Sequence, residues 1–323
     1  MPPKEIVQAA LRAAKATVQS QRTPVLVIGN GNMGGSMLRK WHNDPSLAVT
    51  VVSPRLPQEP LDWVKYCQSV NEIENQKFKV IAITIKPQKV AEVLPDYKNK
   101  LEKDGVAISV LAGASLKTIA GHFSEGAAVV RAMPNLPAKI GQSMTGMMAN
   151  ESASEDQRKL AEDLMKSIGE VVWVQKEDDI NRVTAISGSG PAYFFEVARV
   201  FIEAAKDLGF SAEDATKLVL QTMKGSAELA LSSEQSVEDL RKAVTSPKGT
   251  TEAGLKELMK DGELAGLLKK TTQAAYDRAQ ELAQIAAGFK QSNDKPGEAE
   301  AAPSPKPQQN SCSSLAPQAT KSK

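Results

Sequence analysis

The stretch Pro24–Leu38, PVLVIGNGNMGGSML, decides how this 323-residue chain is organised. Val25–Ile28 is a short apolar run, the pattern of a strand that is buried on both faces. Residues Gly29–Gly34 follow it with the spacing G-x-G-x-x-G, and Gly34–Lys40 then has a helix-compatible composition. A strand, a glycine turn and a helix in this order are typical of dinucleotide-binding folds, so the stretch predicts a nucleotide site.

Each glycine of the motif has its own expected role. Gly29 lets the chain turn sharply, Gly31 removes a Cβ that would block a pyrophosphate, and Gly34 lets the helix approach the strand. The unpaired N–H groups and the positive end of the helix then face the phosphates. A glycine-rich turn without a ligand is the alternative. The preceding strand and the alternation of strands and helices after it favour the nucleotide site.

The composition is that of an ordinary globular protein. The chain is 41% hydrophobic and 24% charged, and its net charge of +2 indicates neither a nucleic-acid nor a membrane partner. Cys67 and Cys312 cannot build a disulfide framework or a thiolate metal site, and His42 and His122 lack ligand spacing. We therefore expect no metal. No apolar run approaches the ~20 residues that a membrane span needs.

Further apolar runs alternate with helical stretches after the glycine turn. We expect helices from Pro87 to about Leu101 and over Ser154–Ile168. The predicted fold class is α/β, with an N-terminal Rossmann-type doubly wound sheet over residues 24–175. The expected further strands are Leu47–Val52, Val80–Thr84, Val106–Val110, Ala127–Ala132, Ser143–Met148 and Val171–Val174.

The pattern changes after about Glu177, and residues 176–289 are predicted to form an all-helical domain. Ala192–Leu208 starts beside Pro191, ends at Gly209 and is apolar almost all round. Such a helix must be buried on every side, which one small domain cannot provide, so we expect a partner subunit. The other expected helices are Ala212–Leu231, Val237–Ala243, Glu252–Lys260 and Glu263–Ala287.

The two terminal segments differ from the rest of the chain. Residues 1–23 are predicted to be a helical extension, because Pro3–Ser20 has apolar residues every fourth position. We expect an accessory helix of a cytoplasmic protein. The basic composition of the segment is also compatible with a mitochondrial or plastid transit peptide, which is the alternative. Residues 290–323 are rich in proline and lack aromatic residues, which predicts a disordered tail.

The end of the second expected strand, Ser53-Pro54-Arg55, indicates the cofactor. An NAD-specific fold usually has an acidic residue here for the ribose 2′-hydroxyl. The hydroxyl of Ser53 and the guanidinium of Arg55 suit a 2′-phosphate instead. The sequence therefore predicts NADPH, with NADH as a possible second cofactor. The alternative for Arg55 is a solvated side chain.

A second constellation lies at Val244–Thr251, VTSPKGTT, where a loop enters a helix. Gly249 permits an open backbone, and the hydroxyls of Ser246, Thr250 and Thr251 cluster beside the free N–H groups of the helix end. This arrangement suits a small carboxylate better than a phosphate. The alternative is ordinary N-capping by Thr250 or Thr251.

Three segments together resemble the pyrroline-5-carboxylate reductase family. They are the GNGNMG turn, Arg131–Ala138 (RAMPNLPA), and Val183–Tyr193 (VTAISGSGPAY) continuing to Ser246–Thr251. The resemblance runs from about Pro24 to Ala287. It implies reduction of 1-pyrroline-5-carboxylate to L-proline, the final step of proline biosynthesis. It also implies two helical dimerisation domains that interlock into a homodimer, often assembled into rings of dimers.

The resemblance, together with Gly34 and Arg55 from the patterns above, gives a set of expected site residues. The substrate set is Glu177, Ser246, Gly249, Thr250 and Thr251, of which Thr251 is the expected catalytic residue. The cofactor set is Ile28, Gly29, Asn30, Gly31, Asn32, Met33, Gly34, Ser53, Arg55, Asn71, Thr84, Ile85, Lys86, Pro87, Val110, Leu111 and Ala112.

Two positions depart from the family pattern. Lys248 stands where the family usually has glycine, and it could attract the substrate carboxylate or restrict the loop. Arg55 stands where some members carry an acid, which concerns cofactor choice only.

The expected chemistry is hydride transfer to the C=N carbon of a cyclic imine acid. The N–H groups of Gly249–Thr251 would hold the carboxylate, and the hydroxyl of Thr251 would hydrogen-bond the ring nitrogen. A β-hydroxyacid dehydrogenase is one rival, but no match to its lysine motif occurs around Lys176 or Lys206. A catalytically silent NADP-binding regulatory protein is the other rival, and it does not explain the hydroxyl loop.

Overall fold

A computed structural model describes residues 22–286 of the chain. The expected helix over Pro3–Ser20 and the expected tail over residues 290–323 lie outside the described residues.

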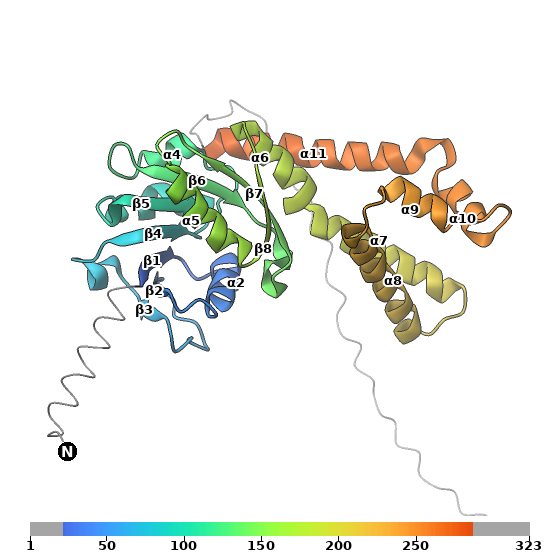
Figure 1. The fold of residues 1–323 in the computed structure, drawn as a ribbon, viewed down its shortest axis with the longest axis horizontal. Helices are drawn as coiled ribbons and strands as arrows, with labels where there is room; N and C mark the ends of the chain where they lie inside the picture. The colour runs from blue at the N-terminus through green and yellow to red at the C-terminus, as the bar shows by residue number, and fades with distance from the viewer. Residues whose placement is uncertain (1–21, 287–323) are drawn as a thin grey trace, which may run out of the picture. The chain divides into compact units, whose positions relative to one another are not determined.

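An eight-stranded sheet with the order β3-β2-β1-β4-β5-β6-β7-β8 forms the first part of the fold (Figure 1). All neighbouring strands are parallel except β6 and β7, which are antiparallel. The strands are β1 (Thr23–Ile28), β2 (Leu47–Val52), β3 (Lys65–Cys67), β4 (Phe78–Ile83), β5 (Leu101–Ser109), β6 (Ala128–Met133), β7 (Ser143–Ala149) and β8 (Gly169–Trp173).

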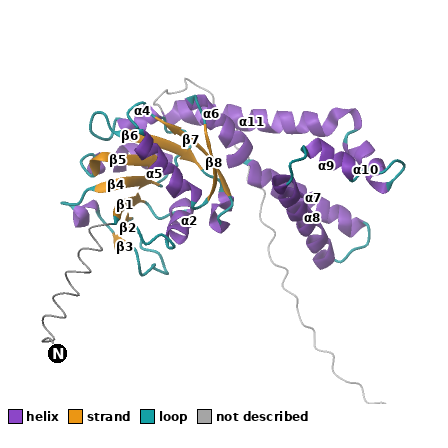
Figure 2. Cartoon of the chain, viewed as in Figure 1, coloured by secondary structure: helices purple, strands orange, loops and turns teal. Residues whose placement is uncertain are grey.

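The sheet carries one hydrophobic core on each face, which is why its strands are apolar at consecutive positions. In β1, Val25 and Val27 belong to one core, while Leu26 and Ile28 belong to the other. All four side chains are almost fully buried. Helices pack beside the sheet (Figure 2) and contribute residues to both cores, and the predicted doubly wound α/β sheet is confirmed. The helices of this part are α2 (Asn32–Trp41), α3 (Val90–Val93), α4 (Leu116–Ala120) and α5 (Glu155–Lys166).

The prediction of one helix from Pro87 to about Leu101 is wrong. The segment contains only the four-residue α3 between two 3₁₀ turns, Pro87–Lys89 and Leu94–Tyr97. Pro95 lies inside the second turn and removes a backbone donor that a longer helix would need. Leu101 is the first residue of β5, where it pairs with Phe78. The sequence analysis also missed β3 and α4, which are three and five residues long.

Only helical elements and turns follow Glu177 within the described part of the chain, as predicted. A π-helical turn at Thr184–Gly188 precedes α7, and Pro191 lies in the first turn of that helix. The helices are α6 (Glu177–Val183), α7 (Gly190–Asp207), α8 (Ala212–Ser232), α9 (Val237–Ala243), α10 (Thr250–Leu258) and α11 (Glu263–Ala286). None of the helices between residues 22 and 286 is long and apolar enough to cross a membrane.

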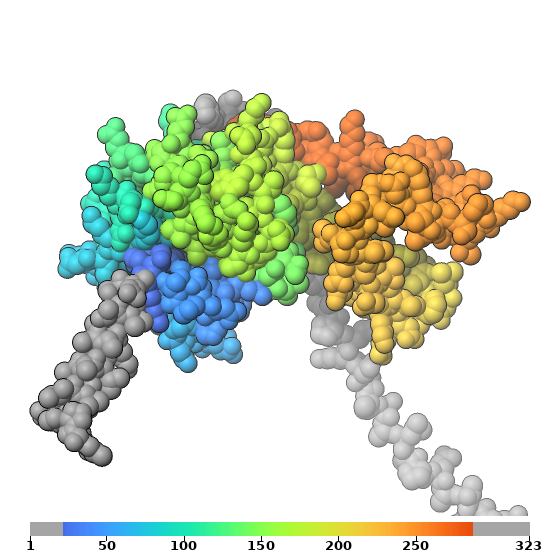
Figure 3. All heavy atoms as spheres, in the orientation of Figure 1, coloured from blue at the N-terminus to red at the C-terminus, as the bar shows by residue number. Residues whose placement is uncertain are grey.

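Helix α7 exposes aromatic side chains that a single chain does not cover. Phe194 is 66% exposed, Phe195 61% and Phe201 52%. The space-filling view draws α7–α10 in yellow to orange (Figure 3). Exposed apolar surface of this extent marks an interaction face, which agrees with the partner subunit expected from the sequence.

Candidate functional site

The turn after β1 requires glycine at its first position. Gly29 has a φ of +95°, a conformation that other residues rarely adopt. A Cβ on this residue would lie 3.2 Å from the carbonyl of Thr84. The N–H of Gly29 donates to the carbonyl of Val52 at 2.9 Å, so the turn is tied to the end of β2.

The N-terminus of α2 has the properties of an anion site. Its N-cap, Gly31, has no side chain to accept from the first N–H groups, and the first turn holds no acidic residue. The backbone of Gly31 (φ −80°, ψ −168°) is one that any residue adopts, and a Cβ there would meet no protein atom within 4 Å. The protein itself therefore has room for a larger residue at this position. A bound pyrophosphate would explain the glycine, because a Cβ would block its close approach to the backbone.

Gly34 brings α2 close to the first strands. A Cβ on Gly34 would lie 2.7 Å from the hydroxyl of Thr84. That hydroxyl lies 3.1 Å from both the carbonyl of Ile28 and the carbonyl of Gly29, and donates toward them. The contact joins the end of β1, the end of β4 and the start of α2 in one arrangement.

A hollow of about 680 Å³ lies at the carboxyl ends of β1, β2 and β4. This edge is where open α/β sheets bind ligands. The predicted cofactor residues that line it are Ile28, Gly29, Asn30, Gly31, Ser53, Thr84, Ile85 and Lys86.

The remaining predicted cofactor residues do not line that hollow. Pro87 and Ala112 line a separate apolar cavity of about 330 Å³ beside Leu282 and Ile285 of α11. Leu111 is buried, and its N–H donates to the hydroxyl of Ser109 at 3.4 Å. The other residues of the predicted set that do not line the hollow are Asn32, Met33, Gly34, Arg55, Asn71 and Val110.

Part of the hollow was not predicted. Most of the missed residues follow β3 or lie in the segment after β4, whose structures were not predicted, while Val52 and Pro54 flank the predicted Ser53. Gln68 and Ser69 follow β3 directly, and a three-residue edge strand has little sequence signal. Tyr97 lies in the 3₁₀ turn that replaces the expected helix, and burial raises the pKa of its hydroxyl to about 12. The missed lining residues are Val52, Pro54, Gln68, Ser69, Val70, Lys89, Glu92, Val93, Asp96 and Tyr97.

The two cofactor residues predicted after β2, Ser53 and Arg55, differ in their exposure to solvent. Ser53 is buried at the hollow, and its hydroxyl donates to the carbonyl of Arg55 at 3.0 Å. The side chain of Arg55 is exposed, so its guanidinium is available to an anion at the rim.

A second hollow of about 670 Å³ lies beside the loop before α10 and shares no lining residue with the first. Of the predicted substrate residues, only Gly249 lines it, whereas Ser246, Thr250 and Thr251 do not. Ser246–Gly249 is a turn closed by the N–H of Gly249, which donates to the carbonyl of Ser246 at 3.0 Å. Gly249 is the N-cap of α10, without a side-chain cap, and Thr250 and Thr251 are its first helical residues. The structure therefore removes the alternative that either threonine is the N-cap. Both threonines and Ser246 are exposed.

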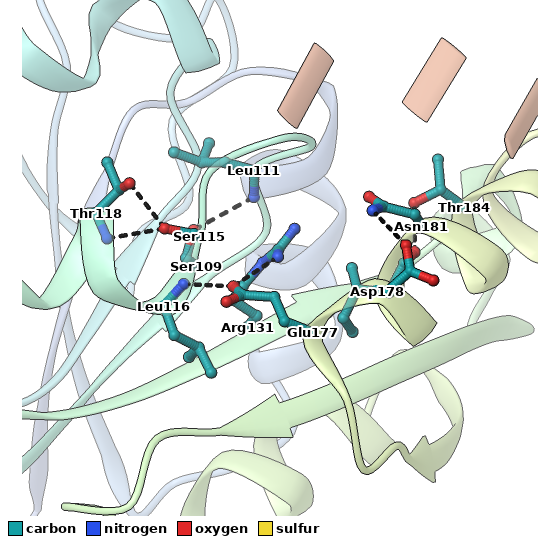
Figure 4. Close-up of polar contacts among 11 residues, drawn as sticks. Ser109, Leu111, Ser115, Leu116, Thr118, Arg131, Glu177, Asp178, Asn181 and Thr184 are labelled. Atoms are coloured by element: carbon teal, nitrogen blue, oxygen red, sulfur yellow. Dashed lines mark hydrogen bonds and ion pairs between the residues drawn. The ribbon is translucent and has the colours of Figure 1, made fainter. Parts of the chain in front are cut away.

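Glu177 takes part in a separate network (Figure 4). Its carboxylate accepts from the N–H of Leu116 at 2.6 Å and from the guanidinium of Arg131 at 2.9 Å. The side chain of Arg131 is only 4% exposed, and burial lowers the pKa of its guanidinium despite the opposing effect of Glu177. No hydrogen bond among residues 22–286 joins Glu177 to the loop before α10.

A similar network attaches α11 to α6. The carboxylate of Asp178 accepts from the hydroxyl of Tyr276 at 2.7 Å and from the amide of Gln280 at 3.2 Å. The bond from Tyr276 is the largest cause that lowers the pKa of Asp178.

The two other motifs singled out in the sequence are hydrogen-bonded to each other. The side-chain amide of Asn135 donates to the carbonyl of Ser187 at 3.1 Å, and its oxygen accepts from the N–H of Met144 at 3.2 Å. The hydroxyl of Ser187 donates to the carbonyl of Met144 at 3.0 Å. The long RAMPNLPA and AISGSG segments thus hold the π-helical turn against β7.

The described residues include no group of three or more His, Cys, Asp or Glu side chains that could hold a metal ion. The chemistry of the two hollows is that of hydrogen-bond donors and helix N-termini, which suits phosphate and carboxylate groups.

Comparisons with known proteins cover both parts of the chain. Residues 177–282 match the family model for pyrroline-5-carboxylate reductase dimerisation, and residues 24–113 match that for NADP oxidoreductase, coenzyme F420-dependent. The chain is 34% identical over 265 residues to pyrroline-5-carboxylate reductase of Pseudomonas aeruginosa, covering 80% of this chain and 97% of that protein.

Solved structures agree with this result. A pyrroline-5-carboxylate reductase from Coxiella burnetii has a TM-score of 0.73 and 35% identity, covering 80% of this chain and 97% of that one. Pyrroline carboxylate reductase of Plasmodium falciparum, solved with NADP bound, has a TM-score of 0.72 and 26% identity, covering 81% and 99%.

Replacing Glu177 tests whether its main role is structural. We expect Glu177→Ala to lower the free energy of unfolding by about 1–3 kcal/mol, because the buried guanidinium of Arg131 loses its partner. Urea unfolding of this variant beside Glu125→Ala, which removes an exposed carboxylate, measures the effect. Unchanged stability together with weaker binding of substrate would show instead that Glu177 serves the substrate.

Proposed function

Because the chain belongs to the pyrroline-5-carboxylate reductase family, we propose that it reduces 1-pyrroline-5-carboxylate to L-proline by hydride transfer from NADPH. The observation that carries the proposal is the extent of the likeness to the Pseudomonas aeruginosa enzyme, which runs over nearly that whole protein. The likeness favours this function over the two rivals, a β-hydroxyacid-dehydrogenase-like enzyme and a silent NADP-binding protein. The test is whether the protein oxidises NADPH only when 1-pyrroline-5-carboxylate is present and forms proline, which neither rival function would do.

The first hollow is the proposed cofactor site. The uncapped N-terminus of α2 and the open space at Gly31 fit a pyrophosphate, and Ser53 and Arg55 fit a 2′-phosphate. Pro87 and residues 110–112 would extend this site along the ends of β4 and β5. The other predicted cofactor residues belong to the first turn of α2 (Asn32, Met33 and Gly34) and to the 3₁₀ turn after β3 (Asn71). When bound, the cofactor supplies the hydride.

The loop before α10 is the proposed substrate site. The N–H groups of Thr250 and Thr251 lie at the positive end of α10 and would hold the carboxylate of the imine acid. The N–H of Gly249 closes the turn instead, so this residue contributes backbone shape. The hydroxyl of Thr251 would donate to the ring nitrogen, which makes the imine carbon a better hydride acceptor. Ser246 would support the loop.

The active assembly is proposed to be a homodimer, and rings of dimers are a further possibility that the family suggests. The match of residues 177–282 to a dimerisation model and the exposed aromatic face of α7 support the dimer. In such a dimer, a partner chain would bring a substrate loop to each cofactor, as the family resemblance implies. We propose domain limits of 24–175 and 176–289, since the sheet ends at Trp173 and α6 begins at Glu177. The cytoplasmic location stays a prediction.

Cofactor choice depends on Arg55 in this proposal. Arg55→Asp should weaken NADPH binding roughly 10–100-fold, the effect of losing one charge-assisted contact, and should leave NADH much less affected. Apparent KM values for both cofactors measure this. Arg55→Gln lacks the added negative charge, so its KM for NADPH should lie between those of the unaltered enzyme and of Arg55→Asp. Equal losses for NADPH and NADH would contradict the assignment.

Assembly depends on the apolar face of α7. Phe194→Asp should disrupt the dimer and abolish activity, because it places a charge in the proposed interface. Sedimentation velocity over a dilution series measures the assembly. Leu56→Asp changes an exposed apolar residue of the first domain and should leave the assembly intact. An active monomer of the unaltered chain would contradict the shared site.

The chemical step depends on the hydroxyl of Thr251. Thr251→Val keeps the shape of the side chain and should lower kcat by roughly 10–1000-fold, as expected for one positioned polar contact. Thr251→Ser keeps the hydroxyl and should remain close to the unaltered enzyme. Affinity for NADPH and the unfolding midpoint should change little in both variants, because Gly249 is the N-cap. Normal turnover by Thr251→Val would exclude a catalytic role.

A further inference from the structure

The substrate loop contains a backbone conformation that is unusual for its residue. Within the turn Ser246–Gly249, Pro247 takes the second position and Lys248 the third. Lys248 has a φ of +58°, in the left-handed region that favours glycine. Another interaction therefore has to offset the cost of this conformation.

Glu252 supplies an interaction at this position. Its carboxylate accepts a hydrogen bond from the N–H of Lys248 at 2.7 Å. Glu252 is the third residue of α10, so its charge also lies at the positive end of that helix. Lys248 and Glu252 thus form a connected pair across the start of the helix.

The position of this carboxylate matters because the proposed substrate is itself a carboxylate. The N–H groups of Thr250 and Thr251, which would hold the substrate, belong to the same first turn as Glu252. The hollow beside this turn is lined by Gly249 and not by the two threonines, and it is basic, with Arg241, Lys248 and Lys256 against the single acid Glu252. An anion in this hollow would meet three cations and one competing charge.

We propose that Glu252 limits the affinity for the substrate, because it competes with the substrate carboxylate for the N-terminus of α10. Glu252 holds the loop in shape while the site is empty, and its charge opposes entry of the anion. Lys248 supplies the backbone donor that holds Glu252, and its ammonium offsets part of the repulsion. This inference rests on the proposed function, since it concerns the affinity for 1-pyrroline-5-carboxylate.

Steady-state kinetics with 1-pyrroline-5-carboxylate at saturating NADPH test the inference. Glu252→Gln removes the charge and keeps an acceptor for the N–H of Lys248, whereas Glu252→Ala removes both. We expect Glu252→Gln to lower KM for the imine acid by about 2–5-fold at low salt and to leave kcat within about twofold. The gain should be smaller in Glu252→Ala, because the strained turn also loses the acceptor for the N–H of Lys248. The difference from the unaltered enzyme should shrink as ionic strength rises.

Two further variants separate charge from loop shape. Glu257→Gln makes the same change of charge on the same helix, outside the hollow, and should leave KM unchanged. Lys248→Gly relieves the left-handed strain of the loop. If the charge of Glu252 is responsible for the effect, adding Glu252→Gln to Lys248→Gly should still lower KM.

The possible outcomes divide clearly. A KM that is unchanged or higher in Glu252→Gln, or an effect that disappears with Lys248→Gly, would show that Glu252 only shapes the loop and would overturn the inference. Lack of turnover by the unaltered enzyme would overturn the proposed function, and this inference with it.

Discussion

The close approach of Gly34 to Thr84 is the constraint on which the nucleotide site depends. The threonine hydroxyl reaches the carbonyls of Ile28 and Gly29, and only a residue without a Cβ leaves room for it. This contact fixes where α2 begins relative to the ends of β1 and β4. The N–H groups of the helix therefore point to the sheet edge where a phosphate would lie. A larger residue at position 34 would move the helix end away from that edge.

Hydrogen-bond networks attach the first helical elements to the sheet. Asn135 joins the loop after β6 to the π-helical turn, and Glu177 joins the start of α6 to the buried Arg131. Asp178 adds the bond to Tyr276 of α11. Burial explains the importance of these contacts, since a buried polar group without a partner is costly. Two of the long sequence motifs thus have a structural role that short-range sequence patterns do not reveal.

The sequence allowed prediction of the parts that local physics controls. Strand β2 and helix α9 have the predicted bounds, because a continuous apolar run defines the strand and the N-cap Ser236 marks the start of the helix. The segment after β4 could not be predicted, since Pro95 and the pairing of Leu101 with Phe78 override its helical composition. Long-range contacts also explain why Gln68 and Tyr97 were missed at the hollow. The left-handed φ of Lys248 is visible only in the structure, although the turn residues around it were clear in the sequence.

A single chain leaves two features incomplete, and one partner would complete both. The aromatic face of α7 is exposed, so burying it needs a second apolar surface. The proposed carboxylate donors, at the start of α10, do not line the hollow proposed for the cofactor, and hydride transfer would need substrate and cofactor to be brought together. In a symmetric dimer each chain would cover the other's α7 and complete the other's site. Folding stability and activity would then depend on the same interface, because loss of the partner exposes the aromatic face and opens the site at once.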